Sequence, residues 1–172
     1  MMKRVETMPA VGQPPQSSKN QTQAIERKRT QHQLMFLIDG SGAMSGTHHT
    51  FCTRYVTAII QHFKALSDMD TSCAMVVYRD YCAQQPVEMM PFTTSQHRAL
   101  SWYKGIDFYG GFQCLAFSDG LALALQTLDS NSTDTNTTQY CFVLANNAFP
   151  VAPVNFVARY KDKTYIDLAN GM

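Results

Sequence analysis

Several features that mark specialised classes of protein are missing from this sequence. No apolar run approaches the roughly 18–20 residues needed to cross a membrane, and the first residues lack the apolar segment of a secretion signal. The five cysteines are odd in number and include no Cys-x-x-Cys pair, which argues against a zinc ribbon and a disulfide framework. We therefore expect an intracellular protein with no membrane partner, whose cysteines are free thiols and buried by default.

Charged residues are also scarce, at 16% of the 172 residues, where about a quarter is usual. The formal net charge of +1 divides unevenly, because residues 1–32 carry six basic and two acidic side chains and the remainder carries eight and eleven. The body therefore lacks the basic surface that nucleic-acid binding requires, and we expect no direct nucleic-acid partner. A lightly charged surface instead favours one that a protein partner covers.

The composition changes near residue 33. We expect a disordered basic and polar tail over residues 1–32, rich in Gln, Ser and Pro, and one domain over residues 33–172. The tail contains the cluster Glu26-Arg27-Lys28-Arg29. This cluster has two interpretations, a solvated group of charges or a nuclear import signal.

Uninterrupted apolar runs predict strands that are buried on both faces. The runs are those of residues 34–38, 72–78 and 140–145. A shorter strand over residues 87–92 is confined to an edge or a hairpin by Pro86 and Pro91. The segment around Tyr165 to Asp167 is interpreted as a further strand.

Between these strands the spacing of apolar residues predicts helices. Residues 51–66 form one helix whose apolar face comprises Phe51, Tyr55, Ile59, Phe63 and Leu66. Residues 95–104 form a short helix that Thr94 or Ser95 caps and Gly105 stops, and residues 115–128 form another. The alternation predicts an α/β fold, a doubly wound and mainly parallel sheet flanked by helices.

Sheets of this kind bind ligands where the carboxyl ends of their strands meet. Residues 39–45, 110–114 and 146–147 are expected there, and the first loop begins Asp39-Gly40-Ser41-Gly42-Ala43. This loop resembles the D-x-S-x-S start of the metal-ion-dependent adhesion site of von Willebrand factor A domains, in which oxygen ligands hold Mg²⁺.

Only Asp39 and Ser41 match that pattern. Position 43 is Ala, the second loop has no Thr, and the third has Asn146-Asn147 where the resembled family has Asp. Two ligands cannot replace enough of the hydration shell of Mg²⁺, so we expect no metal and no cofactor. If the site binds Mg²⁺, Asp39 and Ser41 are its ligands; otherwise Asp39 accepts hydrogen bonds from the amides of its own turn.

A longer stretch narrows the resemblance. Residues 102–111 read Trp-Tyr-Lys-Gly-Ile-Asp-Phe-Tyr-Gly-Gly, Cys114 follows, and residues 119–126 read Asp-Gly-Leu-Ala-Leu-Ala-Leu-Gln. This resembles the amino-terminal von Willebrand factor A-like domain of the Mediator subunit 25 family. The resemblance covers about residues 33–155, and the chain stops before the final helix and strand that it implies, as a truncated or divergent homologue would.

Other candidate sites are less specific. Cys114 has two interpretations, a thiol activated by a nearby helix N-terminus or a packed small residue. His48 and His49 could bind a metal only as a loop pair. Cys52 and His62 are ten residues apart on one helix, about 15 Å, which is too far for a nucleophile and its base. We therefore expect no catalytic residues and no enzyme.

The resemblance implies a non-enzymatic interaction domain of a nuclear transcription coactivator. Such a domain docks onto other Mediator subunits and thereby, indirectly, helps to connect transcription activators with RNA polymerase II. The alternative is a Mg²⁺-dependent ligand-binding A domain, in which Asp39 and Ser41 hold the ion and a partner's carboxylate completes its shell. The two differ in whether Mg²⁺ stabilises the fold.

Overall fold

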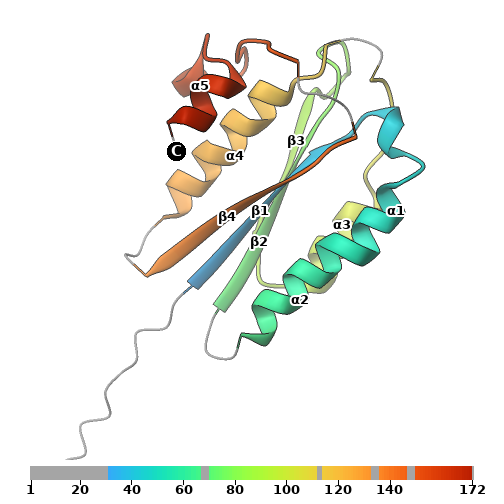
Figure 1. Cartoon of the computed structure of the whole chain (residues 1–172), viewed down its shortest axis with the longest axis vertical. Coiled ribbons are helices and arrows are strands. Elements are labelled where there is room, and N and C mark those ends of the chain that lie inside the picture. The colour runs from blue at the N-terminus through green and yellow to red at the C-terminus, as the bar shows by residue number, and fades with distance from the viewer. Residues whose placement is uncertain (1–30, 67–69, 112–113, 133–135, 147–149, 172) are drawn as a thin grey trace, which may run out of the picture.

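The computed structural model describes residues 31–66, 70–111, 114–132, 136–146 and 150–171 (Figure 1). The first strand begins at Gln31, two residues before the predicted boundary. Residues 1–30 lie outside the described residues, so the disordered tail stays a prediction.

Four strands form one sheet in the order β3-β2-β1-β4. The strands are β1 (Gln31–Asp39), β2 (Asp70–Tyr78), β3 (Val87–Thr93) and β4 (Thr137–Leu144). β1 is parallel to both β2 and β4, while β3 is antiparallel to β2 and lies at an edge. The mainly parallel sheet and the edge position of the proline-containing strand are thus confirmed.

Helices cover both faces of this sheet (Figure 1). One layer holds α1 (His48–Thr50), a π-helical turn (Phe51–Val56), α2 (Thr57–Ala65) and α3 (Gln96–Lys104). The other holds α4 (Phe117–Asn131) and α5 (Tyr165–Asn170). Two short 3₁₀ helices, Gly42–Met44 and Ala158–Tyr160, lie in loops. Each layer packs its own apolar core against β1 and β2.

The predicted burial of β4 is wrong. Eight of the nine residues of β1 are buried, but only Leu144 of β4 is, and Val143 is 42% exposed. The reason is topological: β4 is the end strand of the sheet, so its side chains have neighbours on one side only. An apolar run indicates a strand but does not indicate its place in the sheet.

The predicted buried face of the helix over residues 51–66 is also wrong in part. Cys52, Val56 and Ile60 are the buried residues, while Tyr55 is 50% exposed. The turn at its start is a π-helix, where the Thr57 hydroxyl donates to the Cys52 carbonyl at 2.7 Å. The extra residue in a π turn rotates the face that meets the sheet.

The remaining helices follow the sequence more closely, with one exception. Ser95 caps α3 by accepting from the Arg98 amide, and Gly105 ends it, as predicted. The strand predicted around Tyr165 is instead helix α5. Thr164 and Asp167 cap it reciprocally, and the amide and hydroxyl of Thr164 lower the pKa of Asp167.

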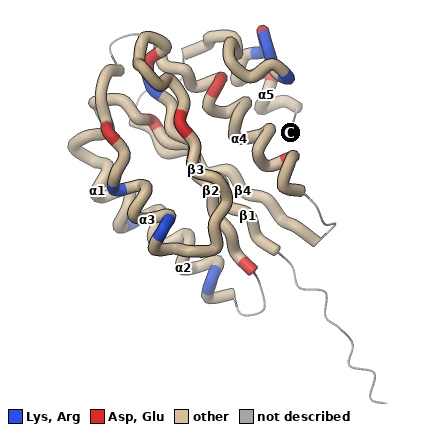
Figure 2. Tube along the Cα trace, turned by 180° about the vertical axis from the view of Figure 1, so that it is seen from behind, with Lys and Arg blue, Asp and Glu red and all other residues tan. Residues whose placement is uncertain are grey.

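Charged side chains are spread around this framework. In the part of the chain that Figure 2 colours, Lys and Arg are scattered over helices and loops and do not gather on one face. No helix among the described residues is both long and apolar enough to cross a membrane.

Candidate functional site

The three loops predicted to meet at the carboxyl end of the sheet do so. The Gly42 amide donates to the Gly110 carbonyl at 3.1 Å, and the Tyr109 amide donates to the Gly40 carbonyl at 3.1 Å. From the third loop, the Asn146 side-chain amide donates to the Ala43 carbonyl at 3.0 Å. Asn147 and residues 112–113 lie outside the described residues. The parallel pairing of β1 with β4 brings Asn146 beside the first loop.

The two predicted metal ligands lie at the centre of this region. Asp39 and Ser41 are both 0% exposed, and the Ser41 amide donates to Asp39 Oδ1 at 2.9 Å. This is the Asx turn that the sequence allows as the structural role of Asp39. Whether either residue binds a metal stays a prediction.

The glycine turn lies directly on this first loop. Gly110 and Gly111 have φ values of 74° and 92°, a region that glycine enters without strain. A Cβ on Gly111 would lie 2.7 Å from the Cβ of Ser41. The backbone of the second loop therefore occupies the space beside Ser41, and no side chain can enter there.

Asp80 fixes this glycine turn, a role that sequence reasoning missed. It follows β2, is 4% exposed, and accepts a hydrogen bond from the Gly111 amide at 2.7 Å. The carboxylate is 31 residues away from that amide in the chain. Its place after a strand end is the only sequence signal that could have found it.

These residues do not fit the octahedral oxygen shell of Mg²⁺. Position 43 offers no side-chain oxygen, and Asn146 supplies an uncharged amide where a carboxylate would bind the cation more strongly; its nitrogen donates to the Ala43 carbonyl and to the Thr47 hydroxyl. Among the described residues, no three His, Cys, Asp or Glu side chains are grouped so that they could hold a metal ion. What the arrangement can do is hold three loops together.

A second polar centre links β2 to its neighbours through Arg79. This side chain is 3% exposed; it donates to the Asp107 carbonyl at 3.2 Å and forms an ion pair with Glu88 at 3.1 Å. The guanidinium also lies over the ring of Tyr109, 5.1 Å from its centre. Arg79 therefore ties β3 to the loop before the glycine turn.

A third centre is the buried carboxylate of Asp119, in the first turn of α4. It accepts hydrogen bonds from the Tyr81 hydroxyl at 2.6 Å and from the amides of Asn155 and Phe156 at 2.8 and 2.6 Å. Burial, followed by the Asp119 carboxylate, raises the pKa of Tyr81. Asp119 thus fixes the segment around Asn155 and Phe156 to the start of α4.

The remaining candidate residues are not brought together. His48 and His49 lie in helix α1, so they are no loop pair, and His48 packs against Phe108 with 4.8 Å between ring centres. Cys114 is exposed, which makes its interpretation as a packed residue wrong, while its reactivity stays a prediction. Cys82 is exposed too, whereas Cys52 and Cys73 are buried as expected, and burial raises the pKa of Cys73 to about 11.

Comparison with known families identifies this architecture. A family model described as the von Willebrand factor type A domain of Mediator complex subunit 25 matches residues 28–172. The chain belongs to this family. Membership in the Mediator subunit 25 family connects the chain with transcription regulation, and a search of curated proteins finds no match.

Solved structures share the fold of this Mediator family member. The pilus adhesin SpaC from Lactobacillus rhamnosus GG, in its open conformation, is 14% identical with a TM-score of 0.52, over 69% of this chain and 15% of that one. The vWF domain of the type V pili tip protein Mfa5 from Porphyromonas gingivalis is 15% identical with a TM-score of 0.51, over 74% of this chain and 43% of that one. These likenesses confirm the A-type α/β fold and show the fold alone.

Proposed function

We propose that this chain is a non-enzymatic interaction domain that docks onto other Mediator subunits in the nucleus. Through them it helps to connect transcription activators with RNA polymerase II. The observation that carries the proposal is the family match over residues 28–172, which spans all the described strands and helices.

The polar residues of the site support a role without catalysis. Asp39, Arg79 and Asp119 are buried, and the contacts described above use each of them to hold a loop in place. A catalytic group has to reach a substrate, and groups that are committed to loop geometry cannot do so. The donor set around Asp39 and Ser41 likewise gives no support to the Mg²⁺-dependent alternative.

Affinity purification of the tagged chain from nuclear extract tests the docking role. We expect mass spectrometry to identify other Mediator subunits among the recovered proteins. A matched preparation of the Asp119→Ala variant, which we expect to loosen the fold, controls for binding to the tag. A folded wild-type chain that recovers no Mediator subunit would contradict the proposal.

The nuclear location has a separate test in the basic cluster Arg27-Lys28-Arg29. A fluorescent fusion of the whole chain should collect in the nucleus, and replacement of the three residues by Ala should reduce that accumulation if the cluster is an import signal. Exclusion of the wild-type fusion from the nucleus would contradict this part of the proposal.

A further inference from the structure

The two helical layers differ in the sign of their charged side chains. Between Asp39 and Asp68 the chain has no acidic residue, and between Glu88 and Asp107 it again has none. These two stretches contain α1, the π-helical turn, α2 and α3, the layer that we call the basic layer. Lys and Arg are spread over the molecule, but Asp and Glu are missing from these helices (Figure 2). The Lys and Arg residues of the basic layer are Arg54, Lys64, Arg98 and Lys104.

The segments of the basic layer form one continuous side of the molecule. The Lys64 ammonium donates to the Thr94 carbonyl at 2.7 Å, which ties the end of α2 to the residues before α3. Burial raises the pKa of the Cys52 thiol, and the charge of Lys104 opposes this rise. The end of α3 therefore lies near the π-helical turn, and the basic residues share one surface.

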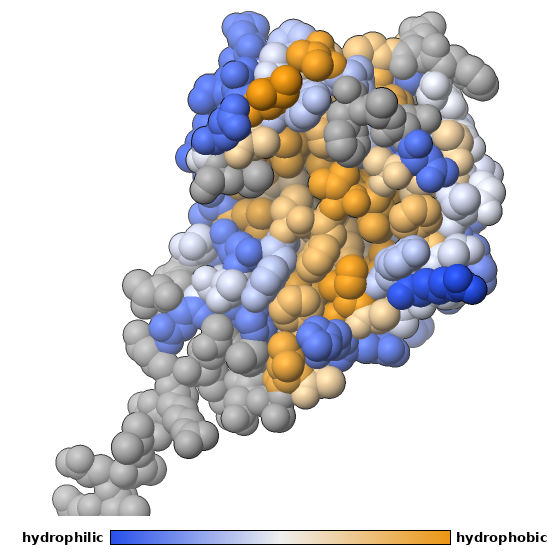
Figure 3. Space-filling model, in the orientation of Figure 1, coloured by the Kyte–Doolittle hydropathy of each residue, from blue (hydrophilic) through white to orange (hydrophobic). Residues whose placement is uncertain are grey.

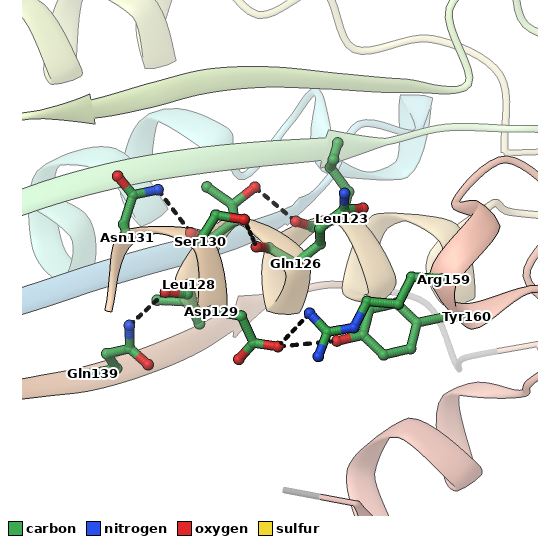
Figure 4. A network of polar contacts seen from close by, with 10 residues as sticks. Leu123, Gln126, Leu128, Asp129, Ser130, Asn131, Gln139, Arg159 and Tyr160 are labelled. Carbon is green, nitrogen blue, oxygen red and sulfur yellow. Dashed lines mark hydrogen bonds and ion pairs between the residues drawn. The ribbon is translucent and has the colours of Figure 1, made fainter. Parts of the chain in front are cut away.

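Outside the basic layer, the chain neutralises its own arginines. Arg79 forms an ion pair with Glu88 at 3.1 Å. In the opposite layer, Arg159 forms one with Asp129 of α4 at 2.8 Å (Figure 4). Both guanidinium groups therefore have a carboxylate of the chain itself beside them.

Inside the basic layer, the arginines have no such carboxylate. Arg54 and Arg98 are exposed, and neither has an acidic partner among the described residues. The same is true of Lys104, whereas Lys64 uses its ammonium on the Thr94 carbonyl. Three cations of this layer are therefore available to carboxylates of another molecule, which Arg binds in a two-pronged geometry.

Apolar side chains lie among these cations. Along α2, hydrophilic and apolar residues alternate on the surface (Figure 3). Tyr55, in the π-helical turn, is 50% exposed, and Leu66, at the end of α2, is 39% exposed. A surface that mixes unpaired cations with exposed apolar groups suits a segment that carries acidic and apolar residues together.

Neither the amino-terminal segment of this chain nor a second copy complements that surface. Residues 1–30 carry six basic and two acidic side chains, so a basic surface repels them. In the opposite layer of a second copy, Asp119 is buried and Asp129 is already paired. Asp162 stands between two lysines in the chain, and Asp167 caps α5. The charge complement therefore comes from a different molecule.

The number of unpaired cations favours a protein segment over a nucleic acid. Binding to nucleic acid at physiological salt depends on neutralised phosphates, with about six to ten contacts in typical cases. The three unpaired cations reach at most about half that number, and salt screens them. An acidic protein segment adds apolar contacts with Tyr55 and Leu66, which salt does not screen.

We propose that the outer side of the basic layer binds an acidic segment of a partner protein, in which Asp and Glu are interspersed with large apolar residues. The carboxylates of this segment pair with Arg54, Arg98 and Lys104, and its apolar residues cover Tyr55 and Leu66. The inference goes beyond the proposed function, because it specifies a surface and the chemistry of its partner and does not require that partner to be a Mediator subunit.

The test uses the purified full chain and a defined peptide. The probe is a fluorescein-labelled peptide of about 20 residues, in which Asp and Glu are interspersed with Phe and Leu. The same peptide with Asn and Gln in place of Asp and Glu is its neutral control. In about 50 mM salt the chain should bind the acidic peptide at least about tenfold more tightly than the neutral one, and about 300 mM salt should remove most of that difference.

Matched charge reversals locate the binding surface. The double variant Arg54→Glu/Arg98→Glu changes the basic layer, and Lys161→Glu/Lys163→Glu changes net charge equally at exposed positions of the loop before α5. The first should weaken binding of the acidic peptide by about tenfold, and the second by less than about threefold. Arg98→Glu is compatible with α3, because position 98 is its third residue and Glu there completes a capping box with Ser95.

Melting curves check that each variant keeps its fold, with midpoints within about 2 °C of wild type. If a reversed chain melts earlier, the same two pairs of positions changed to Gln repeat the comparison. Equal binding of both peptides by wild type, or equal weakening by the two double variants, would overturn the inference.

Two further measurements test the other occupants. If a DNA duplex of about 20 base pairs binds wild type more tightly than the acidic peptide in about 150 mM salt, and Arg54→Glu/Arg98→Glu weakens it, the surface takes nucleic acid and the inference is wrong. If sedimentation shows a wild-type dimer that this variant dissociates, the occupant is a second copy and the inference is also wrong. Recovery of Mediator subunits from nuclear extract is measured separately, so failure of the proposed function leaves this result unchanged.

Discussion

The carboxyl end of the sheet and the outer edge of β4 differ in where their polar groups find partners. At the carboxyl end, Asp39, Asp80 and Asp119 accept hydrogen bonds from loops of the chain itself. Along β4, the outer backbone groups have no strand beside them within the described residues. The end that usually binds ligands in this fold class is closed on itself, and the open region is a strand edge. The two regions therefore differ in how far the described part of the chain itself uses their polar groups.

The largest loss of stability is expected from Asp119→Ala, at the carboxyl end of the sheet. It leaves the amides of Asn155 and Phe156 without their acceptor and leaves the Tyr81 hydroxyl only its longer contact with the Pro153 carbonyl, at 3.2 Å. We expect a loss of about 2–4 kcal/mol in the free energy of unfolding. Urea unfolding measures this loss. Asp119→Asn keeps an acceptor oxygen and should lose about half as much. A loss below about 0.5 kcal/mol for Asp119→Ala would show that this end is not held by its carboxylates.

The second test concerns the glycine turn that closes over Ser41. Gly111→Ala places a Cβ at a φ of 92° and 2.7 Å from the Cβ of Ser41, so we expect a loss of about 1–2 kcal/mol. Gly46→Ala is the matched control, because a Cβ there meets nothing within 4 Å and its φ is not in the left-handed region. Equal unfolding midpoints for the two variants would contradict the close approach of the loops.

Sequence patterns located most of the framework. The apolar runs identified β1, β2 and β4, and the prolines restricted β3 to an edge, because these signals are local in the chain. The edge position of β4 could not be predicted in this way, since the run Tyr140 to Leu144 looks like the run Leu34 to Ile38. Helix α5 has a local signal in the sequence, because Thr164 and Asp167 have the spacing of a capping box at a helix start.

The site was predictable only in outline. The convergence of the loops follows from parallel strands, and Asp39 was found because it ends the first one. Asp80 and Arg79 act on partners that lie about 30 residues away, such as Gly111 and Asp107. Only the paired sheet and its loops bring such residues together, and apart from their place after a strand nothing in the composition or spacing points to them.

The third test concerns the open edge in the isolated chain. Val143→Lys should change the free energy of unfolding by no more than about 0.5 kcal/mol, because an exposed side chain has few contacts to lose. Met89→Lys on the other edge provides the comparison. A loss above about 1.5 kcal/mol for Val143→Lys alone would mean that another part of this same chain covers the edge of β4.

The smallest expected effect is that of Mg²⁺ on the closed end. A ligand that binds only the folded state raises the melting temperature by an amount that grows with the logarithm of its concentration divided by its Kd. Because Ala43 supplies no ligand and the glycine turn fills the space beside Ser41, we expect about 5 mM Mg²⁺ to shift the midpoint by less than about 0.5 °C. Asp39→Asn keeps the shape of the Asx turn and removes the charge that a cation would need. A Mg²⁺-dependent rise of the melting temperature in wild type that Asp39→Asn abolishes would show that the carboxyl end of the sheet binds an ion.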